Sequence, residues 1–143
     1  MKLSTKGRYG LRALVDLAVH SENGTVSIQS IANRQNISVS YLEQLVGKMR
    51  RAGIVTSIRG AAGGYRLAKP PSTISVGDVL RALEGDLEAV NCPGNDEVPA
   101  CEAAPTCVTK YVWKRINDSI SQAVDTIMIE ELVQESKKLN GKE

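Results

Sequence analysis

Apolar residues in the first fifty positions recur every three or four residues, which is the period of amphipathic helices. Either Ser4 or Thr5 can cap the first helix, which ends at residues 21–24. Ser27 caps a short second helix that stops at Asn36. The apolar positions of these two helices are Leu11, Leu14, Val15, Ala18, Ile28, Ile31 and Ala32.

A third helix follows the second after a very short turn. It starts near Ser38 and runs to Arg51, with Gly53 in the place of a C-terminal cap. Two helices joined by so short a connection predict a helix-turn-helix.

The pattern becomes that of β-strands after Gly53. Residues 54–59 are rich in β-branched side chains, residues 60–64 consist of glycine and alanine, and residues 65–68 predict a second strand. This order predicts a hairpin with a glycine-rich tip. A helix, a helix-turn-helix and a hairpin in succession predict a winged helix-turn-helix.

The second half of the chain contains further helical patterns with a loop between them. Ser75 caps a fourth helix that Gly85 closes, and residues 91–105 are loop-like. A long helix begins at about Thr106, breaks near residues 125–126 and continues as a shorter amphipathic piece to Leu139. Its apolar stripe consists of Val112, Ile116, Ile120, Ala123 and Ile127. The predicted fold class is mainly α with a small β-hairpin wing.

Charge is divided unevenly between the two halves. Residues 1–69 hold eleven Lys and Arg against three acids, a net +8, whereas residues 70–143 hold seven against thirteen, a net −6. An asymmetry of this size predicts a basic half that faces a polyanion, with nucleic acid as the first candidate. The alternative is a chance bias between two solvated surfaces.

The composition of 42% apolar and 24% charged residues is that of a soluble globular protein. No apolar run approaches the roughly 18 residues of a membrane-spanning helix, so we expect no membrane partner. The first residues lack the apolar stretch of a secretory signal, which predicts a cytoplasmic location.

The third helix presents a polar face of the kind that enters a major groove. Opposite its apolar positions lie Ser40, Glu43, Gln44 and Gly47, at helical spacing. Gln44 can pair with adenine, and Glu43 can accept a hydrogen bond from the N4 of cytosine. Ser40 and Glu43 also match a capping box, and under that alternative the face needs no DNA.

Arginines flank the glycine-rich tip of the hairpin. Arg59 precedes it and Arg66 follows it, and an arginine beside a close-fitting backbone suits a minor groove. The alternative is a surface hairpin with incidental arginines. The candidate DNA-contacting residues are Ser40, Tyr41, Glu43, Gln44, Lys48, Arg51, Arg59, Gly60 and Gly64.

All three cysteines fall in one loop, as Cys92, Cys101 and Cys107. Clustered cysteines in a cytoplasmic protein indicate metal or redox chemistry more often than disulfides. Their spacing leaves an iron–sulfur cluster, zinc and a thiol switch open, although zinc usually shows shorter cysteine pairs. His20 at the end of the first helix is more simply a solvated residue.

No pattern of an enzyme is present in the sequence: no histidine lies near the cysteines, and there is neither a nucleophile elbow nor a phosphate loop. We therefore expect a protein that is not an enzyme. A winged helix used only for protein contacts is a further alternative, and it would lack a steep salt dependence of DNA binding.

Several of these segments together resemble one family. Residues 1–9, residues 37–45, the glycine-containing stretch 59–65 and the loop cysteines ahead of a long helix are similar to bacterial iron–sulfur cluster regulators of the IscR type, whose relatives include NsrR and CymR. The resemblance implies a homodimer whose long helices cross, two winged helices on palindromic double-stranded promoter DNA, and a [2Fe–2S] cluster on the three cysteines. It also implies a bacterial, nucleoid-associated protein.

The sequence departs from that family at the fourth cluster ligand. The family has a histidine three residues after the third cysteine, and Lys110 stands there in this chain. An ammonium group is a poor ligand at its usual pKa, so the fourth ligand is left unassigned. The loop carboxylates Asp96, Glu97 and Glu102, or a residue of a partner subunit, are candidates.

We therefore predict two regions: residues 1–75 as a winged helix-turn-helix DNA-binding domain, and residues 76–143 as a cluster-binding loop (91–107) with a dimerisation helix. The predicted function is that of a transcriptional regulator, a repressor or an activator, that senses iron–sulfur cluster status. The alternative within the family is a cluster-free regulator or one that responds to nitric oxide or thiols.

Overall fold

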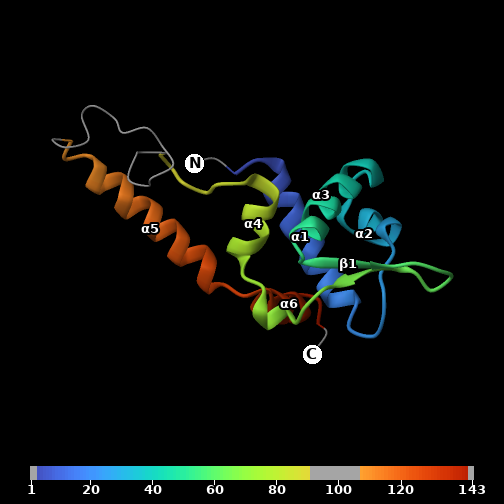
Figure 1. The fold of residues 1–143 in the computed structure, drawn as a ribbon. Coiled ribbons are helices and arrows are strands. Elements are labelled where there is room, and N and C mark those ends of the chain that lie inside the picture. Colours follow the sequence, from blue (N-terminus) through green and yellow to red (C-terminus); the bar gives the residue numbers. More distant parts are fainter. Residues whose placement is uncertain (1–2, 91–106, 142–143) are drawn as a thin grey trace.

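A computed structural model describes residues 3–90 and 107–141 of the chain (Figure 1). The described elements are α1 (Thr5–His20), α2 (Ile28–Gln35), α3 (Val39–Arg51), β1 (Val55–Ile58), β2 (Gly64–Leu67), the 3-10 helix η1 (Pro71–Thr73), α4 (Val76–Glu84), α5 (Lys110–Thr126) and α6 (Ile129–Leu139). The mainly α fold with a two-stranded wing is confirmed. None of the described helices combines the length and the apolar character needed to cross a membrane.

Serine side chains begin four of the helices, as the sequence predicts. Ser4, Ser27 and Ser38 cap α1, α2 and α3 by accepting hydrogen bonds from backbone N–H groups in the first turn. Ser75 caps α4 in a complete capping box with Asp78. The turn between α2 and α3 is short because Asn36 takes a left-handed conformation, with φ of 54°.

The wing is a two-stranded antiparallel sheet in which Val55 pairs with Leu67 and Ile58 with Gly64. The first strand is one residue shorter at each end than the predicted 54–59, and the second has the predicted length but begins one residue earlier, at Gly64. A third, single-residue bridge joins Val26 to Tyr65, with N···O distances of 2.8 Å in both directions. The bridge fastens β2, close to the tip of the wing, to the segment between α1 and α2.

One apolar core runs through the described helices and the first strand. In α3 the buried residues are Leu42, Leu45, Val46 and Met49, which is the predicted apolar face. Val79 and Leu83 of α4 and Ile129 of α6 belong to the same core. The helices α4 and α6 therefore share one core with the helix-turn-helix formed by α2 and α3 and with its neighbour α1.

The helices α1 and α4 approach closely because α1 carries glycine at the crossing. A Cβ atom at Gly10 would clash with the Leu83 side chain, and one at Gly7 would lie 3.2 Å from Cγ of Glu84. The packing of α4 against α1 therefore depends on these two positions.

The helix α5 begins at Lys110 and not at Thr106, so the predicted start is wrong by four residues. Residues 108–109 form a turn, and the carbonyl of Thr109 accepts the N–H of Val112 at 2.9 Å. The predicted break is confirmed, because α5 ends at Thr126 and Ile127 is extended. No described residue of α5 is buried, and the helix projects from the body of the molecule in Figure 1.

Candidate nucleic-acid interface

The outer face of α3 carries the polar residues that the sequence singled out. Ser40, Glu43 and Gln44 are exposed, and Gly47 and Lys48 are half-buried on the same helix. The buried residues of α3 lie on the opposite side of the helix, so one face packs against the core and the other faces solvent. A helix offered in this way can enter a major groove.

The capping-box alternative for Glu43 is wrong. Ser38, and not Ser40, caps α3, and its side chain accepts the N–H of Tyr41 at 3.2 Å. Ser40 lies inside the first turn of the helix, so the pair Ser40 and Glu43 cannot form a capping box. Glu43 is therefore free of that structural duty.

Tyr41 is half-buried against the start of α1. Its hydroxyl lies 3.0 Å from Oγ1 of Thr5, and its ring meets the ring of Tyr9 edge to face at 6.4 Å. The guanidinium of Arg12 lies 5.3 Å from the centre of the Tyr9 ring. These contacts brace the first turn of α3 against α1, a duty that the sequence did not indicate for Tyr41.

A buried charge joins α1 to α2. The side chain of Asp16 is 2% exposed, and it accepts two hydrogen bonds from Nε of Arg34 and one from Nη2, the last at 2.7 Å. Gln35 donates to Asp16 at 2.9 Å, and Asp16 raises the pKa of Arg34. The pairing satisfies the buried carboxylate and holds the C-terminal end of α2 against α1.

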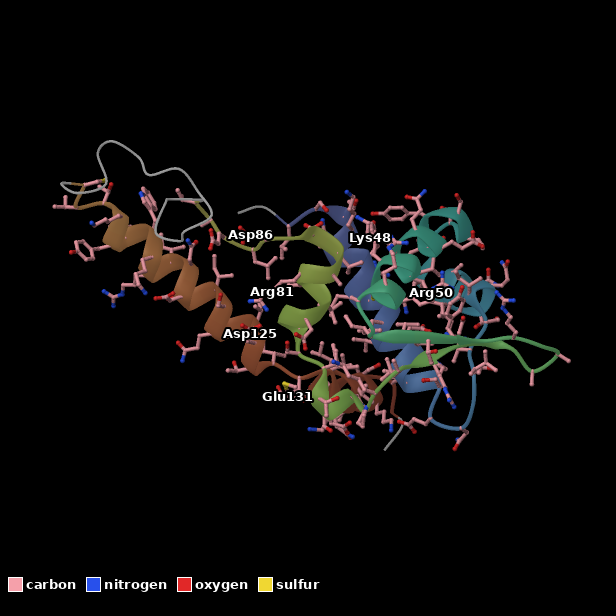
Figure 2. The ribbon with its side chains drawn as sticks, in the orientation of Figure 1. Lys48, Arg50, Arg81, Asp86, Asp125 and Glu131 are labelled. Atoms are coloured by element: carbon pink, nitrogen blue, oxygen red, sulfur yellow. The ribbon has the colours of Figure 1, made fainter. Side chains whose placement is uncertain are left out.

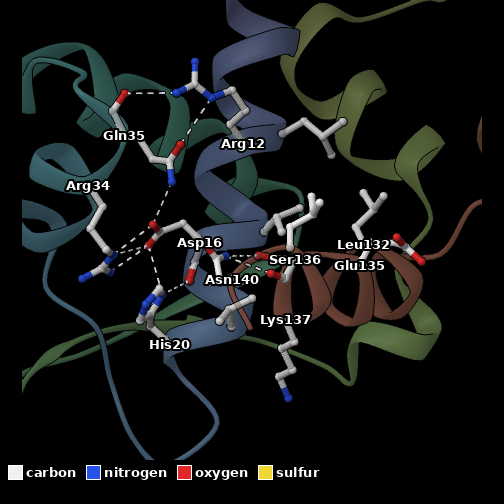
Figure 3. A pocket seen from close by; sticks show the side chains of 14 residues that line it. Arg12, Asp16, His20, Arg34, Gln35, Leu132, Glu135, Ser136, Lys137 and Asn140 are labelled. Carbon is white, nitrogen blue, oxygen red and sulfur yellow. Dashed lines mark hydrogen bonds and ion pairs between the residues drawn. The ribbon is translucent and has the colours of Figure 1, made fainter. Parts of the chain in front are cut away.

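Figure 3 shows this network at the edge of a cavity of about 820 Å³ between α1, α2 and α6. Its lining residues include Leu11, Val15 and Val19 of α1 and Leu132 of α6. His20 lies at the same edge, with Nδ1 at 2.9 Å from the carbonyl oxygen of Asp16. Its side chain is one-third exposed.

The tip of the wing requires glycine for backbone reasons. Gly60 has φ of 110°, and a Cβ at Gly63 would lie 2.5 Å from the carbonyl oxygen of Ile58. Gly64 has φ of 156°, and its Cβ would lie 2.7 Å from the carbonyl oxygen of Val26. The exposed Arg59 is thus carried on a tight, small-residue tip.

Cations gather at the C-terminal end of α3. Lys48 and Arg50 are labelled there in Figure 2, and Arg51 is also exposed. Of the labelled acids, Asp86 follows α4, Asp125 belongs to α5 and Glu131 to α6, and all three lie away from that end of α3. The charge division of the sequence therefore appears as a division in space.

Cys107 is the cysteine that falls within the described residues, and Cys92 and Cys101 lie outside them, as do Asp96, Glu97 and Glu102. Cys107 is half-buried, and its Sγ lies 3.0 Å from Oγ1 of Thr109. Hydrogen bonds from the Thr109 side chain and from the backbone at Lys110 and Thr109 lower the pKa of the thiol. A thiolate of this kind suits metal ligation.

Within the described residues, no group of three or more His, Cys, Asp or Glu side chains is placed to hold a metal ion. Of the loop predicted to bind a cluster, residues 91–107, the described part of the chain holds Cys107 alone. Lys110, at the position of the family's histidine, has its Nζ 5.7 Å from the centre of the Tyr111 ring.

The long helix carries a second candidate surface on its outer side. Val112 is 48% exposed and Ile116 38% exposed. A shallow groove runs along this face, lined by Val112, Arg115, Ile116, Ser119, Ile120 and Ala123. Apolar exposure of this kind along one helix is typical of an interface between protein chains.

The proteins of similar sequence that are described next are transcriptional regulators and not enzymes. The chain is 42% identical over 133 residues to the HTH-type transcriptional regulator IscR of Aliivibrio salmonicida, covering 93% of this chain and 77% of the relative. It is 39% identical over 140 residues to IscR of Pectobacterium atrosepticum, covering 98% and 84%.

Solved structures are similar over nearly the whole chain. CymR, the global cysteine regulator of B. subtilis, matches with a TM-score of 0.77 and 41% identity, covering 94% of this chain and 97% of that one. IscR of T. potens matches with a TM-score of 0.76 and 42% identity, covering 97% and 90%. A family model described as Rrf2, iron-dependent transcriptional regulator, matches residues 3–135. The chain therefore belongs to the Rrf2 family of transcriptional regulators.

Proposed function

We propose that this chain binds promoter DNA as a homodimer and that an iron–sulfur cluster on Cys92, Cys101 and Cys107 controls the binding. The observation that carries the DNA part is the outer face of α3, which offers short polar side chains with cations at its C-terminal end. The membership of the family supports the regulatory role.

In the proposed complex α3 lies in the major groove. Glu43 and Gln44 face base edges, while Lys48 and Arg51 approach phosphates. The wing reaches the neighbouring minor groove, where Arg59 meets the enhanced negative potential and Gly60 lets the backbone come close. Gly64 acts there by seating the wing against the carbonyl of Val26.

The homodimer uses the outer face of α5. Burial of exposed Val112 and Ile116 against a second copy removes apolar surface from water, which favours association. Two copies related by a two-fold axis present two α3 helices, so the proposed operator is an inverted repeat.

The donor set supports an iron–sulfur cluster through Cys107, whose thiol has a lowered pKa and stands just ahead of α5. When bound, a [2Fe–2S] cluster supplies a redox-active, oxygen-sensitive group. Cys107 and Thr109 lead directly into α5, so a change in the ligation of Cys107 acts on the start of the proposed dimer helix.

Salt dependence of binding to a duplex selected by the protein tests the DNA part. We expect the logarithm of the affinity to fall steeply with the logarithm of the salt concentration, and Arg59→Ala to reduce the slope by about one ion if Arg59 contacts phosphate. Lys138→Ala is the matched control, because Lys138 is exposed on α6 and should leave the slope unchanged. A shallow slope in the unmodified protein would instead indicate a winged helix used for protein contacts.

The absorbance spectrum and the iron and sulfide content of anaerobically purified protein test the cluster. We expect a coloured protein with about two irons and two sulfides per chain. Colourless protein whose DNA affinity responds to thiol oxidants would favour the alternative, a cluster-free thiol-responsive regulator. The lowered pKa of Cys107 is the observation behind that alternative.

A further inference from the structure

We propose that Asn117 and the Arg81–Asp125 ion pair set the spacing between the two DNA half-sites that the dimer accepts. They do so by fixing the direction of α5 against the winged helix. This inference rests on the proposed dimer through α5, and it adds a specificity for spacing that base contacts by α3 cannot supply.

The C-terminal end of α5 is pinned by backbone hydrogen bonds. The N–H of Val76 donates to the carbonyl of Ile127 at 2.8 Å, and the N–H of Ile129 donates to the carbonyl of Ile74 at 2.8 Å. This end of α5 is therefore a fixed point on the segment that begins α4.

The ion pair lies one turn of α4 away from that fixed point. Arg81 donates from Nη1 to Oδ1 of Asp125 at 2.6 Å and from Nη2 to Oδ2 at 3.0 Å, and Figure 2 shows the two side chains meeting between α4 and α5. Gly77 lets α5 come this close, because a Cβ there would clash with Oδ1 of Asp125. This bidentate ion pair, made where Gly77 leaves room for it, restricts both the rotation of α5 about its axis and its distance from α4.

Asn117, closer to the N-terminal end of α5, makes a second contact, with residues 89–90 after α4. The N–H of Ala89 donates to Oδ1 of Asn117 at 2.7 Å, and Nδ2 of Asn117 donates to the carbonyl of Val90 at 3.1 Å. Asn117 precedes Ile127 by ten residues, which is about 15 Å along a helix. Because α5 is held both at Ile127 and at Asn117, the direction of its axis is fixed relative to α4.

The residues of α5 that contact the rest of the chain and the residues proposed to contact a second copy lie on different faces of the helix. Asp125 contacts α4 and Asn117 contacts residues 89–90 after it, on the side where Val124 packs against the core. The exposed Val112 and Ile116 lie on the outer face. Since no described residue of α5 is fully buried, apolar packing alone holds the helix weakly, and these polar contacts carry its direction.

In the proposed two-fold dimer, the direction of α5 sets the distance between the α3 helices of the two copies, and so the spacing of the half-sites they can reach. The packing of α4 on α1 at Gly10 and Leu83 joins the direction of α5 to the DNA-reading half. A tilt of about 10° moves the far end of a 17-residue helix by about 4 Å, since such a helix is about 25 Å long. One base pair is about 3.4 Å and about 34° of rotation, so a tilt of this size changes which spacing fits best.

The experiment uses duplexes that carry the same two half-sites with the centre-to-centre distance changed by one or two base pairs in each direction. We expect the unmodified dimer to favour one distance by about tenfold or more, the scale of one or two base contacts. Asn117→Ala and Arg81→Gln should each lower that preference at least about fivefold, or move it to another distance. Affinity for a single half-site should stay the same.

Lys114→Ala is the matched control. Lys114 forms an exposed ion pair with Asp118 at 2.7 Å within α5 alone, so its loss should leave the spacing preference unchanged. Light scattering and thermal unfolding establish that each variant is a folded dimer. A folded dimer of Asn117→Ala and of Arg81→Gln with the full preference of the unmodified protein would overturn the inference. An unmodified protein that is a monomer on DNA would overturn the proposed dimer and this inference together.

Discussion

Glu43 is an acid on the outer face of α3, the helix whose C-terminal end carries the cations Lys48 and Arg51. A carboxylate that faces DNA must be desolvated near phosphates, which is tolerable where a donor such as cytosine N4 meets it. We expect Glu43→Ala to widen the set of bound sequences, with a gain on mismatched sites of about 1–3 kcal/mol. Selection on random DNA with both proteins measures the difference.

The stability of the same variant separates this role from a structural one. Ser38 caps α3 without help from Glu43, so the free energy of unfolding of Glu43→Ala should change by no more than about 0.5 kcal/mol. Uniformly weaker binding together with a lowered melting temperature would contradict a filtering role for Glu43.

The cysteine chemistry is tested by replacing Cys107 and Lys110 separately. Cys107→Ala removes a thiolate with a lowered pKa, so the protein should purify colourless while it stays folded and dimeric. Lys110→Ala should keep the cluster, because an ammonium group is a poor ligand, and Lys110→His should make the cluster more stable. Absorbance and iron content decide both. Loss of the cluster in folded Lys110→Ala would show that Lys110 takes part.

Single residues differ in how well the sequence predicts them. The exposed face of α3 follows from helical period alone, so Ser40, Glu43 and Gln44 were found. Asp16 and Asn117 were missed because their partners lie far away in the sequence, at Arg34 and at residues 89–90. No local pattern marks such pairs, and only the packing of helices brings them together.

At the scale of elements, Glu84 joins the end of α4 to the start of α1. It accepts hydrogen bonds from the N–H of Ser4 at 2.6 Å and from the Ser4 hydroxyl. Burial raises the pKa of the Glu84 carboxyl, but the hydrogen bonds from Ser4 and from the backbone of Gly7, with Lys6 nearby, outweigh it and lower the pKa overall.

A lowered pKa in the folded protein means that the ionised carboxylate stabilises the fold above the unfolded pKa, and that this stabilisation is lost as the pH falls through the folded pKa. We expect Glu84→Gln to lose about 1 kcal/mol at pH 7, a typical value for a carboxylate at a helix N-terminus. The deficit should shrink below about pH 4.5. Denaturant unfolding from pH 7 to pH 3 measures it. A deficit of the same size at every pH would contradict this role.

The wing is positioned by its contact with the segment before α2. Oγ1 of Thr25 donates to the carbonyl of Ala62 at 2.7 Å, and Gly64 packs against the carbonyl of Val26. Gly64→Ala forces a side chain into this contact at a positive φ, so the wing must shift. We expect DNA affinity to fall by about tenfold or more with the helical content unchanged, as measured by fluorescence anisotropy and circular dichroism.

Gly24→Ala is the control for this effect, since Gly24 also has a positive φ but its Cβ would have nothing within 4 Å. Equal losses of affinity in the two variants would indicate general strain rather than a misplaced wing.

For the whole molecule, the order of elements could be predicted from the sequence and their arrangement could not. Helical period, serine caps and the glycine-rich hairpin were sufficient for the winged helix-turn-helix, because each is a local signal. The start of α5 differs from the predicted Thr106 because no side-chain cap marks it: Thr109 precedes the helix without a capping hydrogen bond. The direction of α5 rests on contacts with Arg81 of α4 and with residues 89–90 after α4, and no sequence period encodes these contacts.

Selection of duplexes from a random pool by the purified dimer tests the central claim most directly, that two α3 helices read DNA across a two-fold axis. We predict an enriched inverted repeat whose half-site centres are about one helical turn apart or a multiple of it, about 10–10.5 base pairs per turn. Binding to that repeat should weaken steeply with salt. Enrichment of no sequence, or of a lone half-site bound equally well without its repeat, would contradict the account.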